Sequence, residues 1–353
     1  MDFAPYITPI LAIHLINVVL LFLILRRLKS GVWHALAGAA FFALSATAMD
    51  AWWKPMYVFD LLCTTFSLTS LLLWMHGRRL PAFVAFWFAY KSKELAVMLP
   101  AVLFVYEFLL GDARKGWRRF LPLIPFFATS LSFGLQGILL NPNKNNDYTF
   151  RFTLDSLRAT LPFYARRLFF IPFGGALLFV LALIPDRRIW FGLLAMCLFL
   201  FTLLFLPGRL FEAYTYLPLT GAVIAMTAAG SRLNPAVVWI LLALWFPWNY
   251  RQLNQEQTAK LAADDEVFVY VDKLQSWAAK HPEVKTLVYT AAPPSLHDWG
   301  VTAAWNIGHH TAGLKALYRD WPQSAKAIGE ETVAYATWDG GTRTMSIQIH
   351  SPH

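Results

Sequence analysis

Cysteine and charged residues are both scarce in this chain of 353 residues. Its 2 cysteines, Cys63 and Cys197, lie inside apolar runs and behave as small apolar residues, so no disulfide framework is predicted. Charged residues make up 14% of the chain, whereas hydrophobic residues make up 57%. This composition is too apolar for a soluble globular protein and predicts a polytopic membrane protein.

Several common sites have no matching motif in the sequence. There is no P-loop, no glycine-rich dinucleotide motif after a strand and no tetratricopeptide or other repeat. Zinc-ligand spacing is missing too, and the pair His309 and His310 is interpreted as an exposed loop pair. The net charge of +9 does not predict a nucleic-acid partner, because the basic residues lie at helix ends.

Apolar stretches of membrane-spanning length recur up to about residue 250. We predict ten crossings, at residues 7–25, 32–49, 57–76, 80–92, 95–111, 120–140, 164–184, 189–206, 214–230 and 235–249. Basic residues follow the odd-numbered crossings, so those ends are predicted to be cytoplasmic and both termini to lie outside. The segment 141–167 is an exception, because it is basic yet falls on the outer side.

The composition becomes polar near residue 250. Residues 250–282 are predicted to form a helix with an apolar stripe, residues 285–290 a strand, and residues 301–321 a partly helical segment. Two alternating runs around Asp339, Gly340 and Gly341 predict a hairpin. We therefore expect an all-α membrane domain over residues 1–249 and a small extracytoplasmic α/β domain over residues 250–353.

Charged and aromatic residues gather in three of the predicted outer turns. The acids and bases of these turns are Asp50, Lys54, Lys93, Glu94, Arg209 and Glu212, and Asp60 follows a few residues inside a span. A carboxylate inside an apolar span is costly, so Asp60 is a functional candidate, with a structural ion pair to Lys54 or Lys93 as the alternative. The aromatic residues suit a bound sugar or lipid headgroup, although anchoring at the membrane interface explains them equally well.

The order of these motifs resembles that of the GT-C membrane glycosyltransferases, in particular the bacterial relatives of the transmembrane and tetratricopeptide-containing O-mannosyltransferases. The resemblance rests on three stretches within residues 5–250: "FALSATAMDAWWKPMYVFDLL" (42–62), "YKSKELAVMLPAVLFVYEFLL" (90–110) and "RLFEAYTYLPLTG" (209–221). The family's leading span and its long outer loop, which carries an aspartate regarded as catalytic, have no counterpart before residue 7.

The resemblance implies roles for individual residues. Asp50, Glu94 and Asp60 match acidic positions of the family and are the candidate catalytic residues. The candidate residues for binding the substrate and its lipid phosphate are Lys93, Lys54, Arg209, Glu212, Tyr214, Tyr216, Arg166 and Arg167. This chain departs from the family pattern at Ser45 and Ala46, where a His-Pro pair is usual, and at Ala213, where an arginine is usual.

The activity implied by the resemblance is transfer of a sugar from a polyprenyl phosphate to a hydroxyl of an acceptor glycan, lipid or protein. The protein would lie in a bacterial inner membrane as a multi-pass protein, with its site facing outward. Two alternatives remain open, an inactive binder of a lipid-linked sugar and a transporter; a transporter predicts charges near the membrane midplane, whereas the charges here lie at one face. The sequence also leaves open a requirement for a divalent metal.

Overall fold

The protein, represented by a computed structural model that describes residues 4–140 and 149–351, divides into two compact units. The first is Met1–Gln252 and the second is Leu253–His353. The sequence placed this boundary between residues 249 and 250. Each unit has its own buried apolar core, and we describe each by itself.

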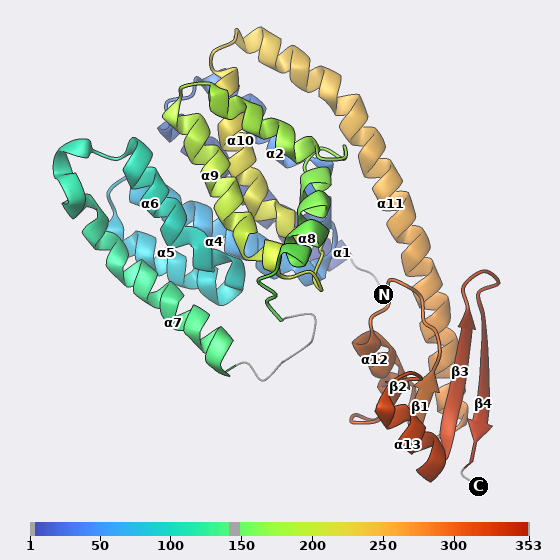
Figure 1. Ribbon diagram of the computed structural model, residues 1–353. Coiled ribbons are helices and arrows are strands. Elements are labelled where there is room, and N and C mark those ends of the chain that lie inside the picture. The colour runs from blue at the N-terminus through green and yellow to red at the C-terminus, as the bar shows by residue number, and fades with distance from the viewer. Residues whose placement is uncertain (1–3, 141–148, 352–353) are drawn as a thin grey trace. The chain divides into compact units, whose positions relative to one another are not determined.

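The first unit is built from helices (Figure 1). Its α-helices are α1 (Ala4–Arg27), α2 (Val32–Leu44), α3 (Met49–Trp53), α4 (Val58–Met75), α5 (Arg79–Ser92), α6 (Leu99–Leu110), α7 (Ile124–Leu140), α8 (Leu154–Arg167), α9 (Arg187–Phe201), α10 (Tyr216–Gly230) and the first part of α11 (Pro235–Lys280). Short 3-10 segments separate them: η1 (Ala46–Ala48), η2 (Pro55–Tyr57), η3 (Glu94–Met98), η4 (Ala113–Leu123), η5 (Gly174–Leu183), η6 (Leu203–Phe205) and η7 (Glu212–Thr215).

Three helical stretches among the described residues are long and apolar enough to cross a membrane. They are Ile7–Arg27, Pro55–Met75 and Arg187–Phe205. A fourth, Val32–Leu44 with Ala46–Trp53, qualifies as a pair bent by 49°. Several other predicted crossings correspond to shorter helices: α5 has 14 residues, or about 21 Å of helix against about 30 Å of hydrocarbon. The helices are thus compatible with membrane insertion, whereas ten crossings stay a prediction.

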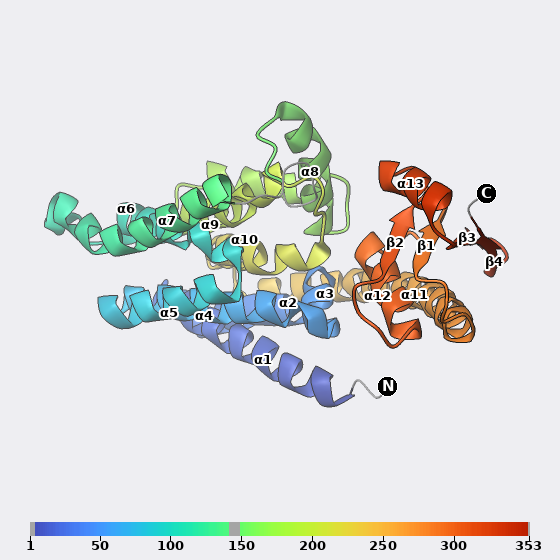
Figure 2. The ribbon, with the colours of Figure 1, turned by 90° about the horizontal axis from the view of Figure 1, so that it is seen from below.

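Small residues allow the helices of the first unit to pack closely. Helix α10 lies against α9 and α2, and α1 lies against α2 and α4, as Figure 2 shows for α1. A close approach is at Gly192 of α9 and Gly221 of α10, where an added Cβ would lie 2.5 Å from a backbone nitrogen of the facing helix. Apolar lipid does not drive helices together, so such close contact is a main source of packing energy.

The second unit has a four-stranded sheet in the order β2-β1-β3-β4. Its strands are β1 (Thr286–Tyr289), β2 (Lys315–Tyr318), β3 (Val333–Asp339) and β4 (Thr344–His350). Strand β1 pairs in parallel with β2 and β3, and β4 pairs antiparallel with β3, with Ala336 opposite Ile347. Helices α12 (Asp298–Gly308) and α13 (Pro322–Glu330) connect the parallel strands, because such strands need a crossover.

Two features of the second unit differ from the sequence-based prediction. Residues 315–318 form strand β2, although we expected only partial helix there, and α13 was not predicted. The four-residue run of β2 is too short to show a period of its own, and its conformation is stabilised by pairing with β1. The predicted strand at 285–290 and the hairpin around Asp339 are present as β1 and as β3 with β4.

Candidate functional site

Asp60 and Lys93 form the centre of a charged cluster at one end of the helical unit. Asp60 lies in the first turn of α4, which follows the break introduced by Pro55, and its side chain is 3% exposed. Its Oδ2 accepts a hydrogen bond from Lys93 Nζ at 2.6 Å. Its Oδ1 is buried and has no hydrogen-bond partner among the residues that the structure describes. The second oxygen is therefore a polar atom that the fold leaves unsatisfied.

Lys93 reaches Asp60 because helix α5 ends at this point. Its backbone is extended, with φ −161° and ψ 147°, and the chain turns from α5 into η3. Cys63 Sγ donates to the carbonyl of Lys93 at 3.8 Å, which links the turn to α4. The Lys93 ammonium also lies 4.2 Å from the ring centre of Tyr214. Lys93 therefore contacts both a carboxylate and an aromatic face.

The third motif supplies aromatic rings and a second cation. The Arg209 guanidinium lies 5.7 Å from the ring centre of Tyr214 and 5.1 Å from that of Phe211. The hydroxyl of Tyr164 donates to the carbonyl of Arg209 at 3.5 Å. Tyr214 thus lies beside two cations, Lys93 and Arg209, that are more than a hundred residues apart in the sequence.

A second ion pair joins Arg167 to Glu212. Arg167 is the last residue of α8 and its side chain is 9% exposed. Its carbonyl accepts a hydrogen bond from Thr47 Oγ1 at 2.9 Å, and the carbonyl of Thr47 accepts one from Thr215 Oγ1 at 3.3 Å. These contacts tie α8 and η7 to the turn that precedes Asp50, so Arg167 of the predicted basic segment meets the acidic turns.

The remaining acids lie at different depths. Asp50, in the first turn of α3, is 5% exposed and acts electrostatically on the hydroxyl of Tyr57, as do Asp60 and Glu212. Glu94 is exposed and lies close enough to Asp60 to interact with its charge. Glu94 is therefore the most accessible carboxylate near the Asp60–Lys93 pair.

Three candidates lie apart from this cluster. Lys54 is half-buried and Arg166 is exposed, and neither side chain makes a hydrogen bond or ion pair to the cluster within the described residues. Tyr216 is completely buried, and its hydroxyl contacts His14 Nδ1 at 2.7 Å and Asn17 Nδ2 at 3.2 Å. Tyr216 thus belongs to the interior of the bundle.

The residues His14 and Asn17 were not identified from the sequence. Asn17 also donates to the carbonyl of Leu61 at 3.1 Å, and His14 Nε2 contacts the carbonyl of Ala43 at 3.2 Å. His14 and Asn17 are three residues apart in an otherwise apolar stretch, so they lie on one face of the helix. This spacing is the sequence signal that could have identified them.

The cluster offers acid, base and anion-binding groups but no metal centre. No group of three or more His, Cys, Asp or Glu side chains that could hold a metal ion occurs within residues 4–140 and 149–351. The side chains described in this cluster can transfer a proton through a carboxylate and bind an anion through lysine or arginine.

Comparison with known proteins gives no further assignment: no protein-family model, no curated protein and no solved structure matches the chain.

Proposed function

We propose that the protein is a membrane glycosyltransferase of the GT-C type that transfers a sugar from a polyprenyl phosphate to an acceptor hydroxyl. The observation that carries the proposal is the meeting of separate motifs: Asp60, Lys93 and Tyr214 come from three segments and are in contact. A cluster of carboxylates, cations and aromatic rings at one end of an apolar bundle is suited to binding a sugar donor whose lipid lies in the membrane.

The proposed reaction is a single displacement at the anomeric carbon of the sugar. The acceptor oxygen bonds to that carbon, the bond from the carbon to the phosphate oxygen breaks, and its electron pair leaves with the polyprenyl phosphate. The acceptor proton passes to a carboxylate, for which we propose either Glu94, which is exposed, or Asp50, which is buried. Lys93 and Arg209, together with Arg167, would stabilise the phosphate as its negative charge increases.

A non-enzymatic protein that binds a lipid-linked sugar is the second candidate. It is favoured by the internal pairing of the cluster, because Asp60 already binds Lys93 and Glu212 already binds Arg167. In such a protein the ion pairs would shape a pocket, and no carboxylate would have to transfer a proton. Turnover separates the two candidates, whereas affinity for the donor does not.

The test uses the full chain in liposomes with a panel of labelled short-chain polyprenyl-phosphate hexoses and a membrane extract as acceptor. We expect Glu94→Gln or Asp50→Asn to reduce sugar transfer about 100-fold or more, which is the usual contribution of a general base. The control is Asp155→Asn, since Asp155 is exposed and pairs only weakly with Arg158 at 3.3 Å. Full transfer by both variants would contradict the proposed site, and donor binding without transfer by the unaltered protein would favour the binder.

A further inference from the structure

An apolar pocket lies in the first unit between α2, η5, α10 and the first part of α11. Its volume is about 590 Å³, within the range of about 300–1,000 Å³ typical of ligand pockets. Its lining is almost entirely hydrocarbon and includes Ala37, Phe41, Val223, Met226, Leu241 and Trp245. The residues of the charged cluster are not among those that line it.

The pocket arises from small residues on two helices and large ones on a third. A Cβ added at Gly38 would lie 2.2 Å from Thr227 Oγ1, so α2 and α10 are in direct contact there. Beside this contact, Ala229 and Gly230 leave space that the large side chains of α11 border but do not fill. Water molecules are poorly stabilised in such a space, because a buried water needs several hydrogen-bond partners and this lining is apolar.

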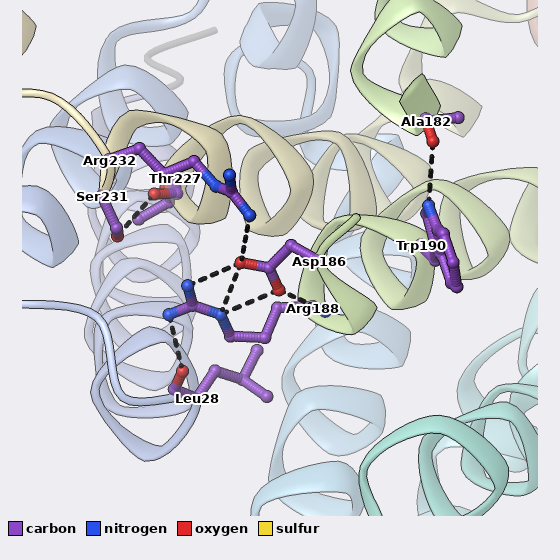
Figure 3. Close-up of polar contacts among 8 residues, drawn as sticks. All are labelled: Leu28, Ala182, Asp186, Arg188, Trp190, Thr227, Ser231 and Arg232. Atoms are coloured by element: carbon purple, nitrogen blue, oxygen red, sulfur yellow. Dashed lines mark hydrogen bonds and ion pairs between the residues drawn. The ribbon is translucent and has the colours of Figure 1, made fainter. Parts of the chain in front are cut away.

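Arg232 is part of the lining, and we call its position the mouth of the pocket because its side chain is about half exposed; Figure 3 shows it beside Asp186 and Arg188. Asp186 accepts hydrogen bonds from the Arg188 side chain at 2.7 to 3.3 Å and from its backbone nitrogen at 2.9 Å. The Arg188 hydrogen bonds hold the pKa of Asp186 below its ordinary value, so the carboxylate stays ionised. Arg232 is farther away, 3.9 Å from Asp186 Oδ2, and its side chain is 48% exposed. Its guanidinium therefore has donors left for a second anion.

Further arginines surround this end of the bundle. Arg188 NH1 donates to the carbonyl of Leu28 at 3.4 Å, and Arg27 NH2 donates to that of Met75 at 2.9 Å. These contacts bring the ends of α1, α4 and α9 together, and Arg188 and Arg232 both lie beside Asp186. Anionic lipid headgroups are attracted to basic groups that lie next to a membrane-embedded helix.

We propose that this pocket holds one hydrocarbon chain of an anionic phospholipid, whose phosphate is bound by Arg232. The apolar lining receives the chain, and the arginines at the mouth distinguish an anionic headgroup from a zwitterionic one. The site is separate from the proposed transferase site and does not depend on enzymatic activity. It does require that the helical unit is inserted in a bilayer.

The experiment uses the full chain in nanodiscs that contain a phospholipid with a photoreactive group in its acyl chain. We expect photoreactive phosphatidylglycerol to label peptides of α2, α10 and α11 about fivefold more than phosphatidylcholine does, the ratio given by one arginine–headgroup contact. Arg232→Gln should remove this preference. Arg114→Gln is its control, because Arg114 is exposed and does not line the pocket.

A second variant tests the pocket itself. Ala229→Phe should reduce labelling of these helices about fivefold by filling the space, whereas Ala128→Phe, at an exposed position of α7, should not. Equal labelling by both phospholipids, or labels spread over the outer helices in all variants, would overturn the proposal. Selective labelling by a photoreactive polyprenyl phosphate instead would also overturn it, because the occupant would then be another lipid.

Discussion

At the scale of single residues, the Asp60–Lys93 ion pair is the central contact of the candidate site. Both side chains are largely buried, at 3% and 13% exposure; Asp60 lies in the first turn of α4 and Lys93 in the turn that follows α5. A buried pair of this kind adds little net stability compared with apolar residues of the same size, but removing one partner leaves an uncompensated charge.

The first prediction concerns Lys93→Met. We expect it to lower the free energy of unfolding by about 3–5 kcal/mol, because Asp60 loses its ion-pair partner. Lys91→Met is the control, since Lys91 is exposed in α5, two residues before Lys93. Thermal unfolding in detergent measures both. A double variant, Lys93→Met with Asp60→Leu, should recover much of the loss, and an unchanged unfolding temperature for Lys93→Met alone would show that the pair is solvated.

The second prediction concerns His309 in the sheet-containing unit. Its ring packs edge-on against Trp305 at 4.5 Å, and both ring nitrogens are buried without a hydrogen-bond partner within the described residues. Burial, assisted by the nearby Lys285, lowers the pKa of His309 below its ordinary value of 6.5. The unfolded chain therefore binds a proton before the folded chain does, and stability decreases as the pH falls below about 6.5.

Pulse proteolysis of the full chain in urea, followed through a C-terminal tag, measures this effect. We expect less urea to be needed to unfold the second unit at pH 5.5 than at pH 7.5, and His309→Phe to show a smaller difference. His310→Asn serves as the control, because His310 is exposed and its φ of 50° suits asparagine. The same pH dependence in His309→Phe would assign the titration to another group.

At the scale of elements, the contact between α9 and α10 sets the distance between the two helices. Gly192→Ala would place its Cβ 2.5 Å from the nitrogen of Ala225, so the helices must move apart. We expect a loss of about 1–3 kcal/mol, which is usual for overpacking. Gly134→Ala in α7 meets no atom within 4 Å and should be neutral or slightly stabilising. Thermal unfolding distinguishes them, and equal stability of the two variants would mean that α9 and α10 can separate freely.

The apolar helices could be predicted from the sequence, but most of their breaks could not. Hydropathy suggested one crossing over residues 32–49, whereas α2 ends at Leu44 and the chain bends. Asn249 explains the bend: its Oδ1 accepts from the nitrogen of Ala46 at 2.8 Å and its Nδ2 donates to the carbonyl of Leu44 at 2.7 Å. These partners lie about two hundred residues apart, so a local window cannot detect them.

The candidate site, too, could be predicted only in part from the sequence. The sequence brought Asp60, Lys93 and Glu212 into one set, and offered Lys54 or Lys93 as partners of Asp60. The structure pairs Asp60 with Lys93 and Glu212 with Arg167. Tyr216 was grouped with Tyr214 because both belong to one motif, but the two rings lie in different environments since η7 gives way to α10 between them. Any catalytic role of these residues stays a prediction.

At the scale of the whole molecule, the predicted topology places the second unit outside and the turn that carries Arg114 in the cytoplasm. We expect Lys326→Cys to react with a membrane-impermeant maleimide in intact cells, because Lys326 is exposed in the second unit. Arg114→Cys should react only after permeabilisation. Cys63 is buried and gives little background. Labelling of both variants in intact cells, or of Arg114→Cys alone, would contradict an outer position for the second unit.

The contacts of Tyr216 with His14 and Asn17 have a consequence for how the bundle finds a single arrangement. Apolar helix surfaces in lipid are nearly interchangeable, so several rotations of α1 against α10 would pack almost equally well. Only one rotation places both polar side chains of α1 at the Tyr216 hydroxyl. Every other rotation would leave them in hydrocarbon at a cost. A one-residue insertion between Asn17 and Arg27 would therefore change which structure forms. The contacts at the two ends of α1 would then require different rotations of the helix about its axis.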